Sequence, residues 1–419
     1  MAVPETPPTA GAPPAAPRQM PDLSDTRTAF AHLSDADLRR AELLFRVIGN
    51  KTLSDVGAAL TKAALWLRLP VKGAIKATIF RQFCGGENRA EGLRTAERLA
   101  HARVNSILDY SVEGQEDDAT LDHTCAEIIA TVEQAKGRGF LAFAVFKPSG
   151  ISPVALLEAV SAGRDPDPEQ RREWTLVQAR FGRICDAAHH AGVPVLVDAE
   201  ESWLQPAIDA LVEQAMARCN RERAIVFNTV QLYRHDRLRF LKEAVARAQQ
   251  AGYHYGVKLV RGAYMEKERA RAAEKGLIDP IQPDKAASDR DYDAALHFCL
   301  AHIDRMAVMA GTHNEASSML LARLVDERGL ARNDRRVWSA QLLGMSDHIS
   351  YNLAAAGYNV AKYVPYGPVR EVMPYLIRRA AENTSARGQS GRELTLITAE
   401  QRRRRDAPRP LTASPPAPR

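Results

Sequence analysis

Hydrophobic and polar positions follow two different periods along the chain. Residues 22–102 carry apolar side chains at three- and four-residue steps with charges between them, as in LSDADLRRAELLFRVI and GLRTAERLAHARVN. This spacing is typical of amphipathic helices. The sequence therefore predicts an α-helical N-terminal region over residues 22–104. Residues 1–21 are rich in Pro and Ala and are expected to form a disordered leader.

From about residue 105 the pattern changes to short β-rich runs, each followed by a longer amphipathic stretch. The predicted strands are Ser106–Val112, Phe140–Lys147, Pro194–Glu200, Ala224–Gln231, Tyr255–Gly262, Ala307–Asn314, Val337–Leu343 and Asn359–Gly367. The stretch after the fourth strand ends at Gly252, as a helix commonly does. Repeated strand and helix units predict a parallel sheet, and eight of them match a (βα)₈ barrel of TIM type over residues 105–395. A doubly wound open sheet is the alternative.

Polar side chains gather at the carboxyl ends of nearly all these strands. They are Glu113, Lys147, Asp198, Gln231, Lys258 with Arg261, Thr312 with His313 and Asn314, Gln341, and Tyr363. The carboxyl ends of barrel strands meet at one mouth, where active sites of this architecture are built. The pattern therefore favours a barrel with one shared site. Taken singly, Asp198 could be a helix N-cap and His313 a core histidine.

Lys258, in VKLVRGAY, is the strongest individual signal. Strand alternation places it on the same side as Val260, towards the barrel centre or another buried face, where a charge needs an anionic partner. The small residues after Arg261 allow a backbone or a ligand to approach closely, and a phosphate, a flavin or a carboxylate would suit such a position. Lys147 could form a Schiff base if it were desolvated.

The stretch after the last predicted strand carries a second cationic pattern. If Pro374 opens a helix, then Tyr375, Arg378, Arg379 and Glu382 share one helix face. A surface pair of Arg and Glu would be an ordinary solvated face. Because the segment directly follows a strand, however, it can lie over the barrel mouth. Adjacent guanidinium groups there would form a fork for a carboxylate.

Composition excludes several classes of protein. No apolar run approaches the length that spans a bilayer, and the five cysteines are scattered without a CxxC pair, which argues against a disulfide framework and a structural zinc site. No metal site is expected around His313, and the dinucleotide, P-loop and nucleophile-elbow motifs are absent. Much of the net charge of +6 lies in the basic, Pro-rich residues 396–419, which are expected to be disordered. Nucleic-acid binding is therefore not expected.

Seven motifs in order, ILDYSVEG, LVDAEES, NTVQLY, GVKLVRGAYMEKERARA, THN, QLLGM and KYVPYGPVREVMPYLIRRAAEN, resemble those of the proline dehydrogenase (proline oxidase) family, and look closest to its eukaryotic-type branch. The resemblance implies a distorted (βα)₈ barrel that holds FAD noncovalently. The implied reaction oxidises L-proline to Δ1-pyrroline-5-carboxylate, with hydride passing from C5 to flavin N5 and electrons passing to a quinone. The aldehyde dehydrogenase domain of bifunctional bacterial members is missing, so a monofunctional enzyme is expected.

The resemblance also implies roles for individual residues. Asp198 and Lys258 are expected to be catalytic, with Arg378 and Arg379 binding the substrate carboxylate. The remaining substrate-site residues would be Lys147, Leu343, Tyr363, Tyr375 and Glu113, the last paired with Arg378. Those contacting or shaping the FAD site would be Ala199, Gln231, Lys258, Arg261, Gly262, Ala263, Tyr264, Thr312, His313, Asn314, Gln341 and Glu382.

A second departure from the family, a prediction about specificity and two alternatives accompany this interpretation. Many bacterial members carry Arg where this chain has Lys258, so a guanidinium that can donate two parallel hydrogen bonds is replaced by a single ammonium group. Tyr363 would crowd C4 of the proline ring, so proline is expected to be preferred over 4-hydroxyproline. The alternatives are a hydroxyproline dehydrogenase and a non-redox barrel lyase or aldolase that uses Lys147. The protein is expected to be cytoplasmic, with peripheral attachment to the inner membrane allowed by the basic tail, or mitochondrial in a eukaryote.

Overall fold

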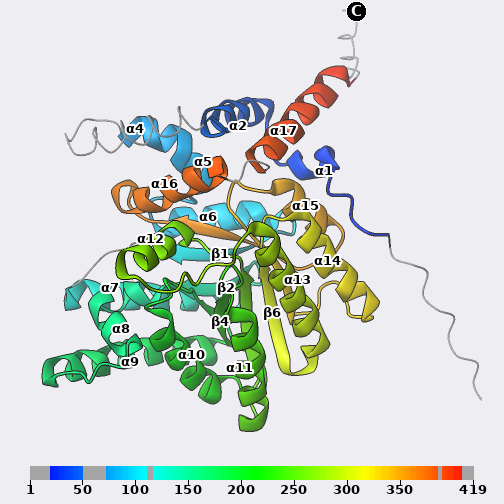
Figure 1. Cartoon of the computed structure of the whole chain (residues 1–419). Helices are drawn as coiled ribbons and strands as arrows, with labels where there is room; N and C mark the ends of the chain where they lie inside the picture. Colours follow the sequence, from blue (N-terminus) through cyan, green and yellow to red (C-terminus); the bar gives the residue numbers. More distant parts are fainter. Residues whose placement is uncertain (1–18, 51–71, 111–116, 386–388, 408–419) are drawn as a thin grey trace, which may run out of the picture.

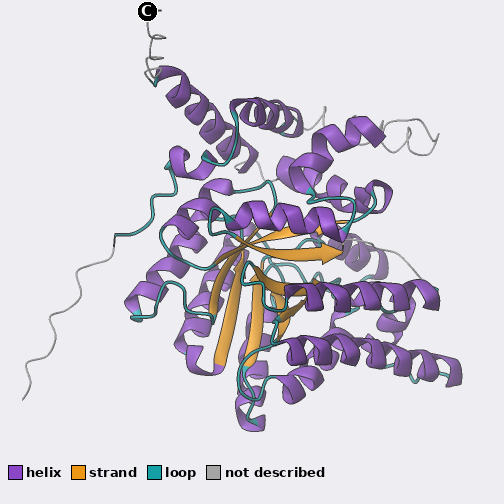
Figure 2. Cartoon of the chain, turned by 180° about the vertical axis from the view of Figure 1, so that it is seen from behind, coloured by secondary structure: helices purple, strands orange, loops and turns teal. Residues whose placement is uncertain are grey.

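The computed structural model describes residues 19–50, 72–110, 117–385 and 389–407. Eight parallel strands close into a barrel in sequence order, β1 to β8, with β8 paired to β1 (Figures 1 and 2). The strands are β1 Asn105–Tyr110, β2 Leu141–Phe146, β3 Val195–Val197, β4 Val226–Gln231, β5 Tyr255–Val260, β6 Met306–Gly311, β7 Val337–Leu342 and β8 Val360–Tyr366. The predicted barrel is confirmed, and the bounds of each strand lie within a residue or two of the predicted bounds, except that β3 and β6 each end three residues earlier than predicted.

The helices that connect successive strands along the chain surround the barrel (Figure 2). They are α7 Asp118–Ala135, α8 Val154–Ser161, α9 Pro168–Ala191, α10 Gln205–Cys219, α11 Arg237–Ala251, α12 Met265–Lys275, α13 Lys285–Ala301, α14 Glu315–Glu327 and α15 Asp347–Ala355, with short 3₁₀ turns at Pro148–Gly150 and Ile303–Arg305. Local chemistry sets several of their ends. The Asp167 carboxylate caps the first turn of α9, and Gly252 ends α11 with φ +74°, a left-handed conformation that favours glycine.

Strand alternation divides the core into an outer and an inner part. Val195 and Val197 of β3 pack against the surrounding helices, whereas Leu196 between them faces the barrel interior. Aromatic side chains fill the interior at the amino halves of the strands, where the rings of Phe143 and Phe227 meet edge to face at 5.3 Å. The interior is therefore closed at this end, and the open end lies at the carboxyl ends of the strands.

The described part of the N-terminal region is largely helical, as its periodicity predicts, and residues 51–71 lie outside the described part of the chain. It contains α1 Thr26–Phe30, α2 Asp35–Ile48, α4 Lys72–Ile75, a π-helical turn at Lys76–Phe80, α5 Arg81–Phe83 and α6 Arg89–Ala100. Helices α1, α2 and α5 pack with the C-terminal helices α16 Val369–Ser385 and α17 Gln389–Asp406 in a second hydrophobic cluster. This layer lies at the top of Figure 1.

Two sequence expectations about the C-terminal helices are wrong. Helix α16 begins at Val369, so Pro374 lies inside it rather than opening it. The buried side chains of Val372 and Leu376 lie on either side of Pro374, and their packing offsets the hydrogen bond that proline removes.

The tail is helical to Asp406, although disorder was expected from residue 396. Leu396 and Ile397 are buried, and the carboxylate of Glu400 pairs with Arg403 and Arg404. These ion pairs relieve the repulsion between neighbouring arginines. Residues 408–419 lie outside the described part of the chain, as does most of the predicted leader.

Candidate active site

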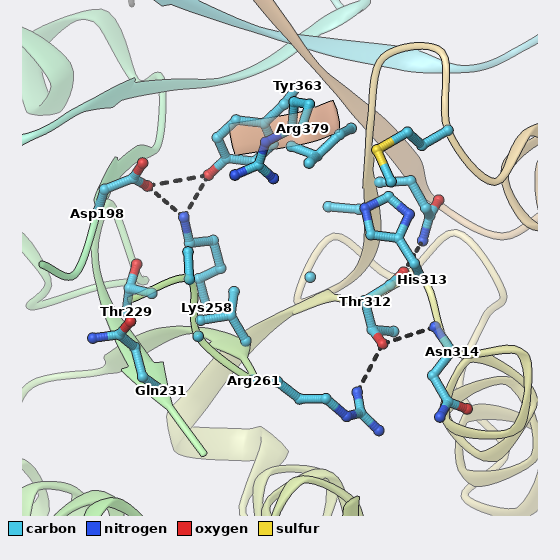
Figure 3. A pocket seen from close by; sticks show the side chains of 18 of the residues that line it. Asp198, Thr229, Gln231, Lys258, Arg261, Thr312, His313, Asn314, Tyr363 and Arg379 are labelled. Carbon is cyan, nitrogen blue, oxygen red and sulfur yellow. Dashed lines mark hydrogen bonds and ion pairs between the residues drawn. The ribbon is translucent and has the colours of Figure 1, made fainter. Parts of the chain in front are cut away.

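The carboxyl ends of the strands, together with α16, enclose a cavity of about 960 Å³. Most of the residues predicted from the sequence meet in its lining: Lys147, Asp198, Ala199, Gln231, Lys258, Arg261, Gly262, Ala263, Tyr264, Thr312, His313, Asn314, Gln341, Tyr363, Tyr375, Arg378 and Arg379. Figure 3 gives a close view of several of them. Residues spread over more than two hundred positions of sequence therefore share one site, because every strand contributes its last residues to the same mouth.

Three predicted site residues do not appear in that lining. Leu343 packs against the outer core between barrel and helices, and the preceding Leu342 lines the cavity instead. The structure therefore places Leu342, and not Leu343, in the cavity lining. Glu113 lies outside the described residues, and Glu382 belongs to α16 at a point where only the backbone is described.

A buried cluster of charges occupies one part of the cavity. Lys258 Nζ donates to the carboxylate of Asp198 and, at 2.7 Å, to the hydroxyl of Tyr363 (Figure 3). Lys147 Nζ lies 2.5 Å from the other carboxylate oxygen of Asp198. The prediction that Lys258 is buried with an anionic partner is confirmed, since only 5% of the residue is exposed.

The two lysines determine the protonation of Asp198. Burial alone would raise the pKa of this carboxyl, but the charges of Lys147 and Lys258 outweigh burial and lower the pKa below its ordinary value. Burial lowers the pKa of Lys258 despite the attraction of Asp198. With all three groups ionised, the two lysines exceed Asp198 by one positive charge, and Asp109, which lines the same cavity, acts on Lys258 as a further negative charge.

Arg261 forms a second fixed cation at the mouth. Its guanidinium donates to Asp289 at 2.6 Å, to Thr312 Oγ1 at 2.9 Å and to Ser317 Oγ at 3.0 Å. The next residue, Gly262, has φ +140°, and a Cβ there would lie 2.4 Å from the ring of Tyr233. Only glycine fits, so the backbone reaches the cavity without a side chain in front of it.

Histidine and amide side chains complete this wall. Burial lowers the pKa of His313 to about 3, helped by the charges of Lys362 and Arg379, so the imidazole is neutral at physiological pH. The Nδ1 of His313 lies 2.9 Å from Ser346 Oγ. Gln341 Nε2 donates to the carbonyl of Thr312 at 3.1 Å. These two hydrogen bonds fix the orientation of His313 and Gln341, whose polar groups line the cavity.

Helix α16 brings its arginines to the same cavity. Arg378, Arg379 and Tyr375 all line it, and the guanidinium carbon of Arg379 lies 5.2 Å from the centre of the Tyr375 ring. Two adjacent guanidinium groups beside an aromatic ring suit a small ligand with a carboxylate and an apolar body.

Further polar residues line the cavity that were not singled out from the sequence: Asp109, Thr229, Lys285, Glu315, His348 and Arg392. Strand periodicity could have found Thr229, which lies two positions before Gln231 on β4. Glu315, His348 and Arg392 come from three helices and meet through ion pairs with Glu315, at 3.0 Å from His348 and 2.8 Å from Arg392. No local pattern in the sequence links these three.

Two kinds of feature are absent from the described residues. No helix there has the length and apolarity that crossing a bilayer requires. In the same part of the chain, no group of three or more His, Cys, Asp or Glu side chains is placed to hold a metal ion.

Comparison with solved structures identifies the same architecture in other proteins. Proline utilization A (PutA) from Bdellovibrio bacteriovorus, inactivated by N-propargylglycine, superposes with a TM-score of 0.67 at 18% identity, over 87% of this chain and 38% of that one. PutA with proline bound in remote sites gives 0.62 at 19% identity, over 93% and 43%. At these identities the likeness establishes the fold, and the chain spans well under half the length of these PutA chains.

Sequence comparison identifies the family. The carbapenem antibiotics biosynthesis protein CarD of Pectobacterium carotovorum subsp. carotovorum is 38% identical over 77% of this chain and 83% of its own length. Mitochondrial proline dehydrogenase 1 of Arabidopsis thaliana is 30% identical over 91% and 86%, and its human counterpart is 42% identical over 56% and 40%. A sequence model of proline dehydrogenase matches residues 92–392, most of the chain. The chain therefore belongs to the proline dehydrogenase family.

Proposed function

We propose that the protein oxidises L-proline to Δ1-pyrroline-5-carboxylate with bound FAD. The observation that carries this proposal is the meeting, in one cavity, of the Arg378 and Arg379 guanidinium groups with the buried cluster of Lys258, Asp198 and Lys147. Membership of the proline dehydrogenase family supports the substrate and the reaction class.

The cavity suits FAD together with a small substrate. At about 960 Å³ it lies near the upper end of the usual range for ligand sites, far more than proline alone requires. Its basic residues, Arg261, Lys285 and Arg392, suit the diphosphate of FAD. The bare backbone at Gly262 permits close approach of a flat ring system. Gln231, Lys258, Thr312 and His313 would contact the cofactor, which supplies a two-electron acceptor when bound.

The protein's own residues would bind and orient the substrate. Arg378 and Arg379 would hold the carboxylate, while Tyr363, Tyr375 and Leu342 would enclose the apolar ring. Oxidation removes a hydride from C5 and a proton from the ring nitrogen, which leaves a C=N bond. The ammonium groups of Lys147 and Lys258 would stabilise negative charge that passes from proline to an acceptor beside them in the same cavity.

The lyase or aldolase alternative is disfavoured by the state of Lys147. A Schiff base requires an amine that is free to attack a carbonyl, but the Nζ of Lys147 lies 2.5 Å from an Asp198 oxygen and is engaged in an ion pair. The hydroxyproline alternative is disfavoured by the bulk of Tyr363 at the cavity.

A quinone-type acceptor at a membrane surface completes the proposal. It rests on family membership rather than on any group seen in the cavity. Several eukaryotic relatives carry the name mitochondrial, and we propose a corresponding peripheral location at a respiratory membrane for this chain.

One experiment tests cofactor, substrate and reaction together. The absorption spectrum of the purified protein is recorded before and after anaerobic addition of L-proline, and the imine product is trapped with o-aminobenzaldehyde. Flavin bands that bleach with proline, together with trapped imine, are expected. A colourless protein that takes up no added FAD would refute the proposal.

A further inference from the structure

The loop between β7 and α15 connects the cavity to the C-terminal helix. Ser346, at the start of α15, is fully buried and has φ +51° and ψ +43°, a left-handed conformation that non-glycine residues seldom adopt. Such a conformation persists only where surrounding contacts fix it. The contacts that fix Ser346 therefore determine where its side chain lies.

Ser346 has a contact towards the cavity and another that leads away from it. Its Oγ lies 2.9 Å from Nδ1 of His313, a residue of the cavity wall. Its backbone N–H donates to a carboxylate oxygen of Glu393 on α17. A chain of two hydrogen bonds thus runs from the C-terminal helix to a histidine of the candidate cofactor site.

Glu393 is well suited to fix this loop. Only 3% of it is exposed, and it lies one residue beyond the segment that matches the proline dehydrogenase family. The next residue, Asp347, begins α15 and is fixed in turn by Lys362 Nζ at 2.6 Å and by His32 Nε2 at 3.5 Å. The N-terminal segment and α17 therefore both contact the start of α15 from outside the barrel.

We propose that Glu393 is a positioning residue for the cofactor site. By accepting the N–H of Ser346, it keeps the loop in the left-handed geometry that places Ser346 Oγ against His313. The hydroxyl then fixes the orientation and the tautomer of the imidazole, which sets the hydrogen-bonding group that His313 presents to the cofactor. This role rests on the proposed function, because it concerns FAD binding.

The test compares variants of the full chain by two readouts. The Kd for FAD is measured by flavin fluorescence on the apo-protein, and the unfolding temperature is measured on the same apo-protein. Glu393→Ala is expected to weaken FAD binding about tenfold, within the range for residues coupled through one hydrogen-bond chain. Glu393→Gln retains an acceptor oxygen and is expected to restore most of the affinity. Ser346→Ala should weaken binding similarly, and the double variant should be no worse than either single variant.

Glu400→Ala provides the matched control. Glu400 is the other fully buried acid of α17, but it pairs with Arg403 and Arg404 and does not line the cavity. Its replacement should lower the unfolding temperature and leave the Kd for FAD unchanged. Unchanged affinity in Glu393→Ala, failure of Gln to restore affinity, or an equal loss in Glu400→Ala would overturn the positioning role alone. A wild-type chain without affinity for FAD would refute the proposed function and this role together.

Discussion

The hydroxyl of Tyr363 accepts a hydrogen bond from Nζ of Lys258 at 2.7 Å inside the barrel mouth. Both residues are buried, and Lys258 is held in turn by the carboxylate of Asp198. The Tyr363 ring therefore has a fixed orientation in the cavity. A fixed ring can discriminate between substrates by size, which a mobile ring does poorly.

Tyr363→Ser should relax the selection against 4-hydroxyproline. Removing the ring opens space beside the substrate, and a steric contact of this size changes kcat/KM by about 10- to 200-fold. The measurement is kcat/KM for L-proline and for trans-4-hydroxy-L-proline in both proteins. Tyr363→Phe keeps the ring but loses the bond to Lys258, so it should retain most of the discrimination. A wild-type enzyme that oxidises both substrates equally well would contradict this account.

Much of the fold could be predicted because local pattern and tertiary packing agree. In strand β5, Val257 and Leu259 face the surrounding helices and Lys258 between them faces the barrel interior, as strand alternation predicts. Helix α11 ends at a glycine with positive φ, as its sequence predicts. The errors arise where packing overrides local preference. Pro374 lies inside α16 because its neighbours are buried on both sides, and α17 is ordered because Leu396 and Ile397 find partners on helices far away in sequence.

The residues of the candidate site could be predicted at the carboxyl ends of the strands, and less well elsewhere in the chain. Lys258 and Gln231 lie in strands and Thr312 directly follows one, where barrel geometry fixes their meeting point. The contact of Ser346 with Glu393 joins a loop to a helix that no periodicity places beside it. Such contacts depend on tertiary packing, which sequence pattern alone does not specify.

Asp198→Asn should abolish most activity while retaining the fold. The substitution removes the carboxylate shared by Lys147 and Lys258 and leaves the buried ammonium of Lys258 beside the half-buried ammonium of Lys147, which costs about 3–5 kcal/mol for a broken buried pair. We expect kcat to fall at least about 100-fold, as for loss of an electrostatic group at a reacting centre. The measurement is the rate of anaerobic cofactor reduction by proline, with the unfolding temperature as a second readout.

Asp209→Asn is the control for that substitution. Asp209 forms a buried ion pair with Arg237 at 2.9 Å, between α10 and α11 and away from the cavity lining. Its replacement should lower stability to a similar extent but leave kcat near the wild-type value. Equal losses of kcat in both variants would mean that the effect of Asp198 is on folding rather than on the reaction.

Glu200 should make the stability of the protein depend on pH. Burial raises the pKa of Glu200 from 4.5 to about 7, against the stabilising bond from the Ser149 N–H. Between these values the folded state holds a proton that the unfolded state has lost, so stability falls as pH rises, by up to about 1.4 kcal/mol per pH unit for one proton. Glu200→Gln cannot titrate, and its free energy of unfolding in urea should fall less steeply across this window. The exposed Glu222→Gln should keep the wild-type slope, and an identical slope in Glu200→Gln would contradict the assignment.

The arginines of α16 should act on the substrate carboxylate. Replacing Arg378 or Arg379 by Met removes a charge-assisted hydrogen bond worth about 1.5–3 kcal/mol, which corresponds to a roughly 10- to 150-fold rise in KM for proline. Arg370→Met is the matched control, because Arg370 is exposed on the same helix and does not line the cavity. Its KM should be unchanged.

L-Prolinamide separates carboxylate binding from a general disturbance of α16. It keeps the ring and the amine of proline but lacks the anionic carboxylate, so the guanidinium groups of Arg378 and Arg379 lose their charged partner. Wild-type protein should therefore use prolinamide poorly, and the two Met variants should lose little further activity towards it. If the variants lose activity equally towards proline and prolinamide, the arginines support the helix or the cofactor rather than the carboxylate. Loss confined to proline would instead place the carboxylate of the substrate at this pair.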